Sequence, residues 1–186
     1  FGGEPPEGTP DLNAVVNSLE MSSKPVVSAI HGVAAGGGLE VALGTHYRVG
    51  AAKTRVGLPE VTLGILPGAG GTQNLPRLIG APLAKELMWT GRRISGAEAK
   101  EWGFIVDCVP DDELEAATDK LVDELREFSP LAQRTIKGVL NAAQNTTVEA
   151  GIEIEGNAYG RLRTSADFAE GVAAFHEKRK AAFKGK

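Results

Sequence analysis

The chain has 186 residues, of which 42% are hydrophobic and 24% are charged, and its formal net charge is −4. These values are ordinary for a globular protein with a sizeable core, and the negative charge argues against nucleic acid as the main partner. No run of 18 apolar residues predicts a membrane span, and the single cysteine, Cys108, excludes an internal disulfide framework. No cluster of Cys and His residues suggests a metal site.

The first half of the chain predicts an α/β arrangement. Apolar residues at helical spacing follow Asp11, which is the expected N-cap. The short apolar run KPVVSAI is typical of a buried strand. In chain order, the predicted elements are a loop over residues 1–10, a helix over 11–21, a strand over 24–30, a glycine loop followed by a helix over 38–44, a strand over 46–52 and a Gly/Pro-rich loop over 54–71.

The second half predicts helices almost throughout. Ser95 and Glu98 form a capping box for a helix that ends near Gly103, and Pro130 stands at the first helical position after Ser129. The other predicted elements are helices over 71–79 and 81–89, a strand over 104–109, a helix over 112–128 with Phe128 on its apolar face, and two helices capped by Thr147 and Ser165.

These elements predict an α/β core over residues 1–110, followed by a helical region over 111–186 that serves as a lid or an assembly surface. The last helix is expected to continue through the basic residues between Lys178 and Lys186, which would complement its dipole. Trp89 and Trp102 are expected in the core.

Three consecutive glycines, Gly36, Gly37 and Gly38, precede the predicted helix over 38–44. Glycine is the default residue for a tight turn with close helix–sheet packing, which is one interpretation. Phosphate binding is a second, but the Lys-Ser/Thr of a P-loop is absent. The third is an oxyanion hole, in which a backbone N–H binds a carbonyl oxygen that gains charge in the transition state.

Two isolated glutamates favour the third interpretation. Glu40 lies inside the predicted helix and Glu60 lies in GLPEVTLG; between Asp11 and Glu98 the only other acidic residues are Glu20 and Glu86. Each glutamate alone is read more readily as a surface acid or a helix cap. Together, beside a candidate oxyanion loop, they suit general acid/base chemistry on a polarised carbonyl compound.

Residues 24–80 read KPVVSAIHGVAAGGGLEVALGTHYRVGAAKTRVGLPEVTLGILPGAGGTQNLPRLIG. This segment resembles the core of the crotonase superfamily, specifically its enoyl-CoA hydratases. The later TGRRISGAEAKEWGFIVDCV and the ending FAEGVAAFHEKRKAAFKGK follow in family order, so the resemblance covers the chain from about residue 11 onward. It implies an α/β fold with a crotonase-like ββα spiral core and a C-terminal helical region used for trimerisation. It also implies that the N-terminal part of the fold, with the family's other oxyanion donor, is missing. We therefore expect a chain cut from a longer protein that is poorly soluble or dependent on assembly.

The resemblance implies a role for each candidate site residue. Glu40 would act as base on a water that adds to C3 of a trans-2-enoyl-CoA, and Glu60 would protonate C2, giving 3-hydroxyacyl-CoA by syn addition in fatty-acid β-oxidation. Gly37 would supply an oxyanion-hole N–H. Gly68 would position the water or substrate, although its sequence context is equally that of a turn glycine. The enzyme would be a carbon–oxygen lyase.

The resemblance also implies binding partners. Tyr159, Phe175 and Lys178 match positions near the CoA or the acyl tail, which in many members are contributed by a neighbouring subunit. The expected assembly is a homotrimer or homohexamer. No metal and no cofactor are expected, because CoA enters as part of the substrate, and neither nucleic acid nor membrane is an expected partner. The expected location is the cytoplasm, or mitochondria or peroxisomes in a eukaryote.

Two alternatives stay open. A Δ3-Δ2 enoyl-CoA isomerase would need Glu60 alone, whereas the hydratase needs Glu40 as well. A non-catalytic assembly or RNA-binding protein with the crotonase fold would need neither glutamate, but the net charge of −4 disfavours RNA binding.

Overall fold

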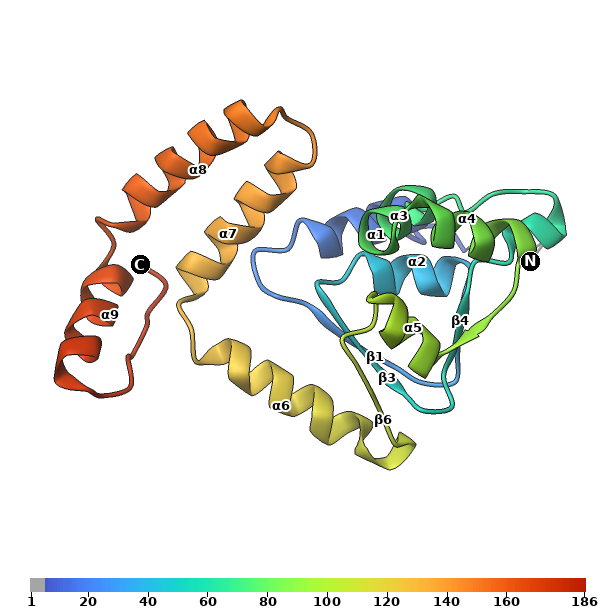
Figure 1. Ribbon diagram of the computed structural model, residues 1–186, viewed down its shortest axis with the longest axis horizontal. Coiled ribbons are helices and arrows are strands. Elements are labelled where there is room, and N and C mark those ends of the chain that lie inside the picture. The colour runs from blue at the N-terminus through green and yellow to red at the C-terminus, as the bar shows by residue number, and fades with distance from the viewer. Residues whose placement is uncertain (1–5) are drawn as a thin grey trace. The chain divides into compact units, whose positions relative to one another are not determined.

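The computed structural model describes residues 6–186, which form two compact units (Figure 1). The first unit contains the described residues up to Ser22 together with Val26–Asp119, and the second contains Ser23–Pro25 and Lys120–Lys186. Of the loop expected over residues 1–10, the first five residues lie outside the described residues.

Two small sheets organise the first unit. One is fully parallel, in the order β1-β3-β6, and the other has the order β2-β4-β5, with β2 parallel and β5 antiparallel to β4. The strands are β1 (Val27–Ile30), β2 (Val33–Ala35), β3 (Tyr47–Ala51), β4 (Arg55–Gly57), β5 (Ile94–Ser95) and β6 (Asp107–Val109). Parallel neighbours need crossover connections, and the helices provide them.

The helices of the first unit pack on these strands or on one another. They are α1 (Leu12–Glu20), α2 (Gly37–Leu43), the 3-10 helix η1 (Glu60–Leu63), α3 (Gly71–Ile79), α4 (Ala81–Thr90), α5 (Gly96–Trp102) and the 3-10 helix η2 (Asp111–Glu113). Gly80, with φ 79°, ends α3 and precedes α4. The core around α2 contains fully buried Leu39, Leu58, Leu75, Leu87 and Phe104. Helix α2 is therefore fixed between a sheet and α3 (Figure 1).

The second unit is helical. Helix α6 (Leu114–Arg126) begins in the first unit and ends in the second. Helices α7 (Pro130–Ala143) and α8 (Val148–Leu162) pack side by side as a hairpin, and α9 (Ala166–Glu177) is followed by a C-terminal segment that turns back (Figure 1). The caps predicted at Thr147 and Ser165 are confirmed, and Ser129 caps α7 in the same way, because each hydroxyl accepts a backbone N–H three residues on.

Several expected elements need correction. The Gly/Pro-rich segment 54–71 contains β4 and η1, and β2 lies inside the expected glycine loop, because such short strands leave no periodic signal. The strand expected over 104–109 is confined to β6, since the N–H groups of Phe104 and Ile105 bond to Ala99 O as part of the turn after α5.

Helix ends also differ from expectation. The side chain of Asp11 makes no capping hydrogen bond, although α1 begins at the next residue. The helix expected over 112–128 ends at Arg126, which leaves Phe128 outside it and exposed. The last helix ends at Glu177, so the basic residues from Lys178 onward follow the helix instead of continuing it.

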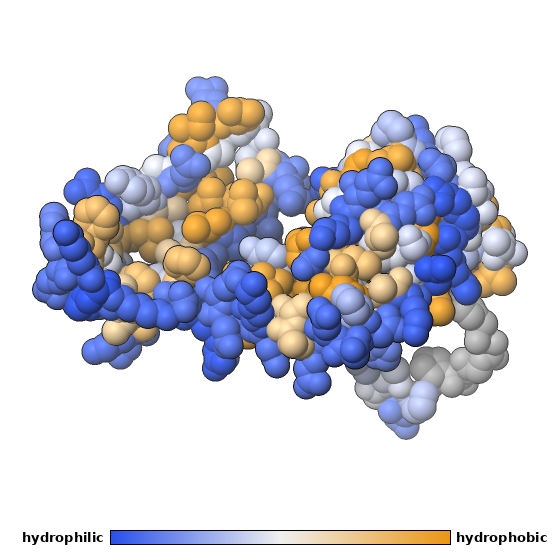
Figure 2. Space-filling view, turned by 60° about the horizontal axis from the view of Figure 1, so that its bottom comes forward, coloured by the Kyte–Doolittle hydropathy of each residue, from blue (hydrophilic) through white to orange (hydrophobic). Residues whose placement is uncertain are grey.

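Apolar side chains are exposed on both units, where Figure 2 shows them among polar surface. Trp89 was expected in the core but is 72% exposed, with the Lys85 ammonium 5.6 Å from its ring centroid, whereas Trp102 does pack partly against the core. Among residues 6–186, no helix is both long and apolar enough to cross a membrane.

Candidate active site

The register of two parallel strands brings Glu40 and Glu60 close to one another. Ala35 at the end of β2 pairs with Gly57 at the end of β4, and the Gly36 N–H donates to Gly57 O at 3.0 Å. Parallel strands end at the same edge of a sheet, so the segments that follow them start together. One leads into α2, which carries Glu40, and the other leads into η1, which begins at Glu60.

The glycine triplet has three different local requirements. Gly36 has φ 58° and ψ −130°, a conformation that side chains strongly disfavour, and an added Cβ would stand 3.0 Å from Glu60 Oε1. A Cβ at Gly37 would meet Leu12 Cδ2 at 2.7 Å, so the end of this partly exposed side chain of α1 would have to move. A Cβ at Gly38 would meet no atom within 4 Å. Packing within the described chain therefore does not explain why residue 38 is a glycine.

Helix α2 also presents donors. The N–H groups of Leu39 and Glu40 bond to Gly36 O, as a first helical turn requires. In the described part of the chain, the N–H groups of Gly37 and Gly38 have no hydrogen-bond acceptor. The first N–H groups of a helix have no partner within the helix and can bind an external oxygen.

The carboxylate of Glu40 is buried and fixed by backbone donors. Its side chain is 3% exposed, and Oε1 accepts hydrogen bonds from Ala69 N at 2.7 Å and Gly71 N at 2.9 Å. Two N–H donors on one oxygen are the arrangement that a carboxylate anion favours. Both hydrogen bonds use Oε1, so Oε2 stays available to accept a proton.

Glu60 has a different environment. It is 6% exposed, and its Oε2 is buried with no hydrogen-bond partner among residues 6–186. Burial raises the pKa of Glu60 above its ordinary value, and the nearby charge of Glu40 raises it further, against the effect of a backbone hydrogen bond. Glu60 therefore retains a proton to higher pH than an exposed glutamate does.

The loop before α3 completes this part of the site. Gly68 has open space around it, and the two residues whose N–H groups bind Glu40 follow it closely. A Cβ at Gly71 would stand 3.0 Å from Glu40 Oε1, so a larger residue would displace the carboxylate. Sequence reasoning missed the donors Ala69 and Gly71; the small residues of PGAGG were the available signal, because close backbone approach requires them.

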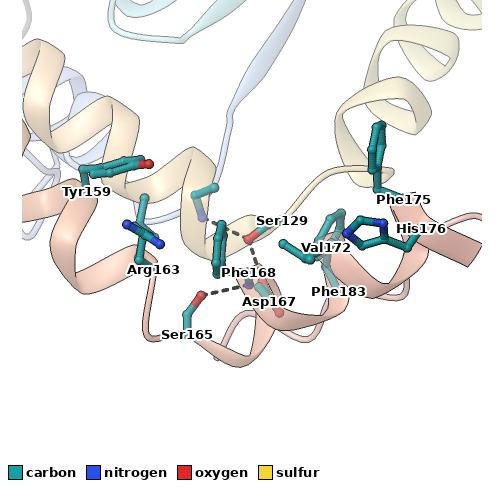
Figure 3. A pocket seen from close by; sticks show the side chains of 13 residues that line it. Ser129, Tyr159, Arg163, Ser165, Asp167, Phe168, Val172, Phe175, His176 and Phe183 are labelled. Carbon is teal, nitrogen blue, oxygen red and sulfur yellow. Dashed lines mark hydrogen bonds between the residues drawn. The ribbon is translucent and has the colours of Figure 1, made fainter.

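The remaining predicted residues lie in the second unit. Tyr159 and Phe175 line one apolar groove of about 500 Å³, together with Phe168, Val172 and Phe183 (Figure 3). Tyr159 and Phe175 are 61% and 81% exposed. Lys178 is not part of the groove lining; it forms the left-handed turn that ends α9, with φ 54°. Within the described residues, no group of three His, Cys, Asp or Glu side chains could hold a metal ion.

Comparison with known proteins gives consistent matches. The family model described as Enoyl-CoA hydratase/isomerase matches residues 9–186. The mitochondrial enoyl-CoA hydratase domain-containing protein 2 of Homo sapiens is 41% identical over 179 residues, 94% of this chain and 61% of that protein. Mitochondrial methylglutaconyl-CoA hydratase of Rattus norvegicus is 41% identical over 178 residues, 94% of this chain and 56% of that protein.

A solved structure also matches. The crystal structure of enoyl-CoA hydratase from Bacillus anthracis has a TM-score of 0.91 and 40% identity to this chain, covering 94% of this chain and 68% of the other. The chain thus spans 56–68% of the length of these three proteins.

Proposed function

This chain belongs to the enoyl-CoA hydratase/isomerase family and has the crotonase-type α/β fold, and from that premise we propose that it carries the two acid/base groups of a 2-enoyl-CoA hydratase. The observation that carries the proposal is the contrast between the two buried carboxyl groups. Glu40 is held by two N–H donors, whereas Glu60 has a raised pKa and an unpartnered Oε2. Pairs of titratable groups in opposed environments are typical of acid/base assignments.

The contrast supports one proposed role for each glutamate. Glu40 takes a proton from a water molecule as the water oxygen bonds to C3 of the enoyl group. The electron pair of the C2=C3 bond moves toward the thioester carbonyl, whose oxygen becomes enolate-like. Glu60 then gives its proton to C2, which completes addition of one water and yields 3-hydroxyacyl-CoA. We propose that water and proton add to the same face, because two neighbouring carboxyl groups would lie on one side of the substrate.

Gly37 is the proposed oxyanion donor of this chain. Its N–H has no acceptor among residues 6–186, and Gly38 beside it has no neighbour within 4 Å of an added Cβ. A thioester could therefore lie against the bare backbone. Removal of one such donor costs about 10²–10³-fold in rate in other enzymes. The space at Gly68 is proposed to hold the water or the substrate.

A second reaction has its own support. Glu60 is the glutamate with both the raised pKa and the unpartnered oxygen, and a single such group can take a proton from C2 of a 3-enoyl-CoA and return it to C4. That transfer moves the double bond to C2=C3 and makes the protein a Δ3-Δ2 enoyl-CoA isomerase. Glu40 has no part in this reaction.

The proposal is tested by hydration of a short-chain trans-2-enoyl-CoA, followed as loss of the conjugated thioester absorbance. Glu40→Gln and Glu60→Gln are each expected to lower kcat by about 10²–10⁴-fold. Glu101→Gln, on the exposed face of α5, removes the same charge and is the matched control. Double-bond migration that survives Glu40→Gln and disappears with Glu60→Gln, without hydration by the wild-type chain, would establish the isomerase instead.

The remaining expectations belong to the same proposal. We propose that Tyr159, Phe175 and Lys178 contact the CoA or the acyl tail, and that the protein assembles as a homotrimer or homohexamer. No separate cofactor takes part in the proposed reaction, since CoA arrives with the substrate. Retention of the chain on immobilised CoA, and its loss in Lys178→Ala, would test the first point.

A further inference from the structure

The C-terminal segment, residues 178–186, follows α9 and lies back against it. We propose that Asp167 is a positioning residue whose buried carboxylate clasps this tail, and that the clasped tail fixes both the Lys178 turn and the Phe183 wall of the apolar groove. The part of the proposal that concerns CoA affinity rests on the proposed function, whereas the clasp itself does not.

Asp167 joins three parts of the second unit. It stands in the first turn of α9 and is 4% exposed. Its Oδ1 accepts N–H groups of Lys184 at 2.8 Å and Gly185 at 3.0 Å, and its Oδ2 accepts the Ser129 hydroxyl at 2.6 Å. Its own N–H donates to Lys186 O at 3.0 Å. Figure 3 shows the hydrogen bond between Ser129 and Asp167, which both belong to the lining of the groove.

Ser129 connects the clasp to α7. Its Oγ accepts Ala132 N at 3.1 Å, as the N-cap of α7, while its hydroxyl proton goes to Asp167. One carboxylate thus ties the start of α7, the start of α9 and the end of the chain. Burial alone would raise the pKa of Asp167, but the Ser129 hydroxyl and the backbone N–H groups of the tail outweigh it, so the pKa is lowered.

A second acidic residue of α9 attaches the first part of the tail. Glu170 binds Arg179 through both oxygens, at 2.6 Å and 3.0 Å, and its Oε1 also accepts Ala182 N at 2.7 Å. These bonds lower the pKa of Glu170 to about 2. Lys180 pairs with Glu127, from the segment that follows α6, at 2.5 Å. The tail is therefore held at both of its ends.

The clasped tail shapes the groove. Phe183 is a lining residue, and a Cβ at Gly171 of α9 would stand only 3.5 Å from its ring (Figure 3). Lys178 has φ 54°, which costs free energy in any residue but glycine and persists where the surroundings fix it. The bonds of Arg179 on the next residue provide that constraint. If the clasp were lost, the Phe183 side chain that lines the groove and the backbone turn at Lys178 would both lose their fixed positions.

Amide hydrogen exchange of the full chain tests the clasp directly. In Asp167→Asn one oxygen becomes an NH₂ group and the charge is lost, so a single, weaker acceptor oxygen replaces the two carboxylate oxygens that bind the Ser129 hydroxyl and the tail N–H groups. The amides of Lys184 and Gly185 are then expected to exchange on the order of 10–100-fold faster, as for hydrogen bonds to a charged group. Glu153→Gln, an exposed position on α8, removes the same charge and should leave them unchanged. Equal exchange in Asp167→Asn and the wild type would overturn the proposal.

A second variant covers the case in which Asp167→Asn loosens the whole unit. In Glu170→Gln the Ala182 amide is expected to exchange faster, while amide exchange within α7 and α8 stays as in the wild type. An unchanged exchange rate at Ala182 would contradict the clasp. The link to substrate is read from kinetics. Both variants should raise KM by about 2–5-fold, as for misplacement of an exposed charge, with kcat kept. A fall in kcat at constant KM would refute the link, and a wild-type chain without turnover would count against the proposed function but not against the clasp.

Discussion

Gly36→Ala is the substitution that most sharply tests the geometry of the two-carboxyl site. Gly36 combines φ 58° with ψ −130°, and its N–H bond to Gly57 O fixes that backbone in place. The alanine Cβ would also stand 3.0 Å from Glu60 Oε1, closer than a normal carbon–oxygen contact. The backbone cannot relax without losing the strand pairing, so the unfavourable conformation and the close contact with Glu60 both destabilise the variant.

The expected loss of stability follows from these two penalties. A side chain in such a glycine-only conformation costs roughly 1–3 kcal/mol. The contact with Glu60 adds less, because a carboxylate at the end of a side chain can move by a few tenths of an ångström. That movement, however, displaces the proposed proton donor. We therefore expect the free energy of unfolding to fall by roughly 1–3 kcal/mol and turnover to fall as well.

Gly38→Ala is the matched control, two residues further along. Its Cβ meets no atom within 4 Å, and alanine is favoured over glycine inside a helix by roughly 0.5–1 kcal/mol. The variant should be as stable as the wild type or more stable, yet less active if a thioester lies against this backbone. Urea unfolding followed by circular dichroism, with the hydration assay, measures both quantities. Equal stability of Gly36→Ala and Gly38→Ala would refute the reasoning.

Three further predictions concern single side chains. The pKa of Glu60 is raised in the folded state, so the folded chain keeps a proton on Glu60 that the unfolded chain releases, and its free energy of unfolding falls as pH rises above 4.5. Glu60→Gln removes the titrating group and should not show this fall. The free energy of unfolding of Glu60→Gln relative to the wild type, measured by urea unfolding, should therefore grow from pH 4.5 upward. Arg48 is buried, its pKa is lowered to about 10, and its guanidinium donates to carbonyl oxygens of Ala42, Thr45 and Phe104. Because Arg48→Met leaves these oxygens without a donor, it should lower the free energy of unfolding by about 1–3 kcal/mol. An unchanged free energy of unfolding would mean that water replaces the guanidinium. Lys178→Gly should raise the free energy of unfolding by about 1–2 kcal/mol, because glycine adopts the left-handed turn without strain. The same variant should bind immobilised CoA more weakly. A destabilised variant would show that the Lys178 side chain itself supports the fold.

Local patterns in the sequence determined the helices and many of their ends. Thr147 and Ser165 cap the helices that they are expected to cap, because capping depends only on a hydroxyl and an N–H three residues away. The α/β class and the family were also readable, since glycine spacing and acidic residues in a fixed order survive in the sequence.

The tertiary structure decided what local patterns do not encode. Strands β2 and β4 have three residues each, and only their pairing brings Gly36 beside Glu60. The basic residues after Glu177 continue a helical pattern, but the chain turns at Lys178 because the tail finds partners on α9. The sequence by itself determined which residue types are available and where helices begin. The register between distant strands, and the burial that raises the pKa of Glu60, came only from long-range packing, since both depend on neighbours far along the chain.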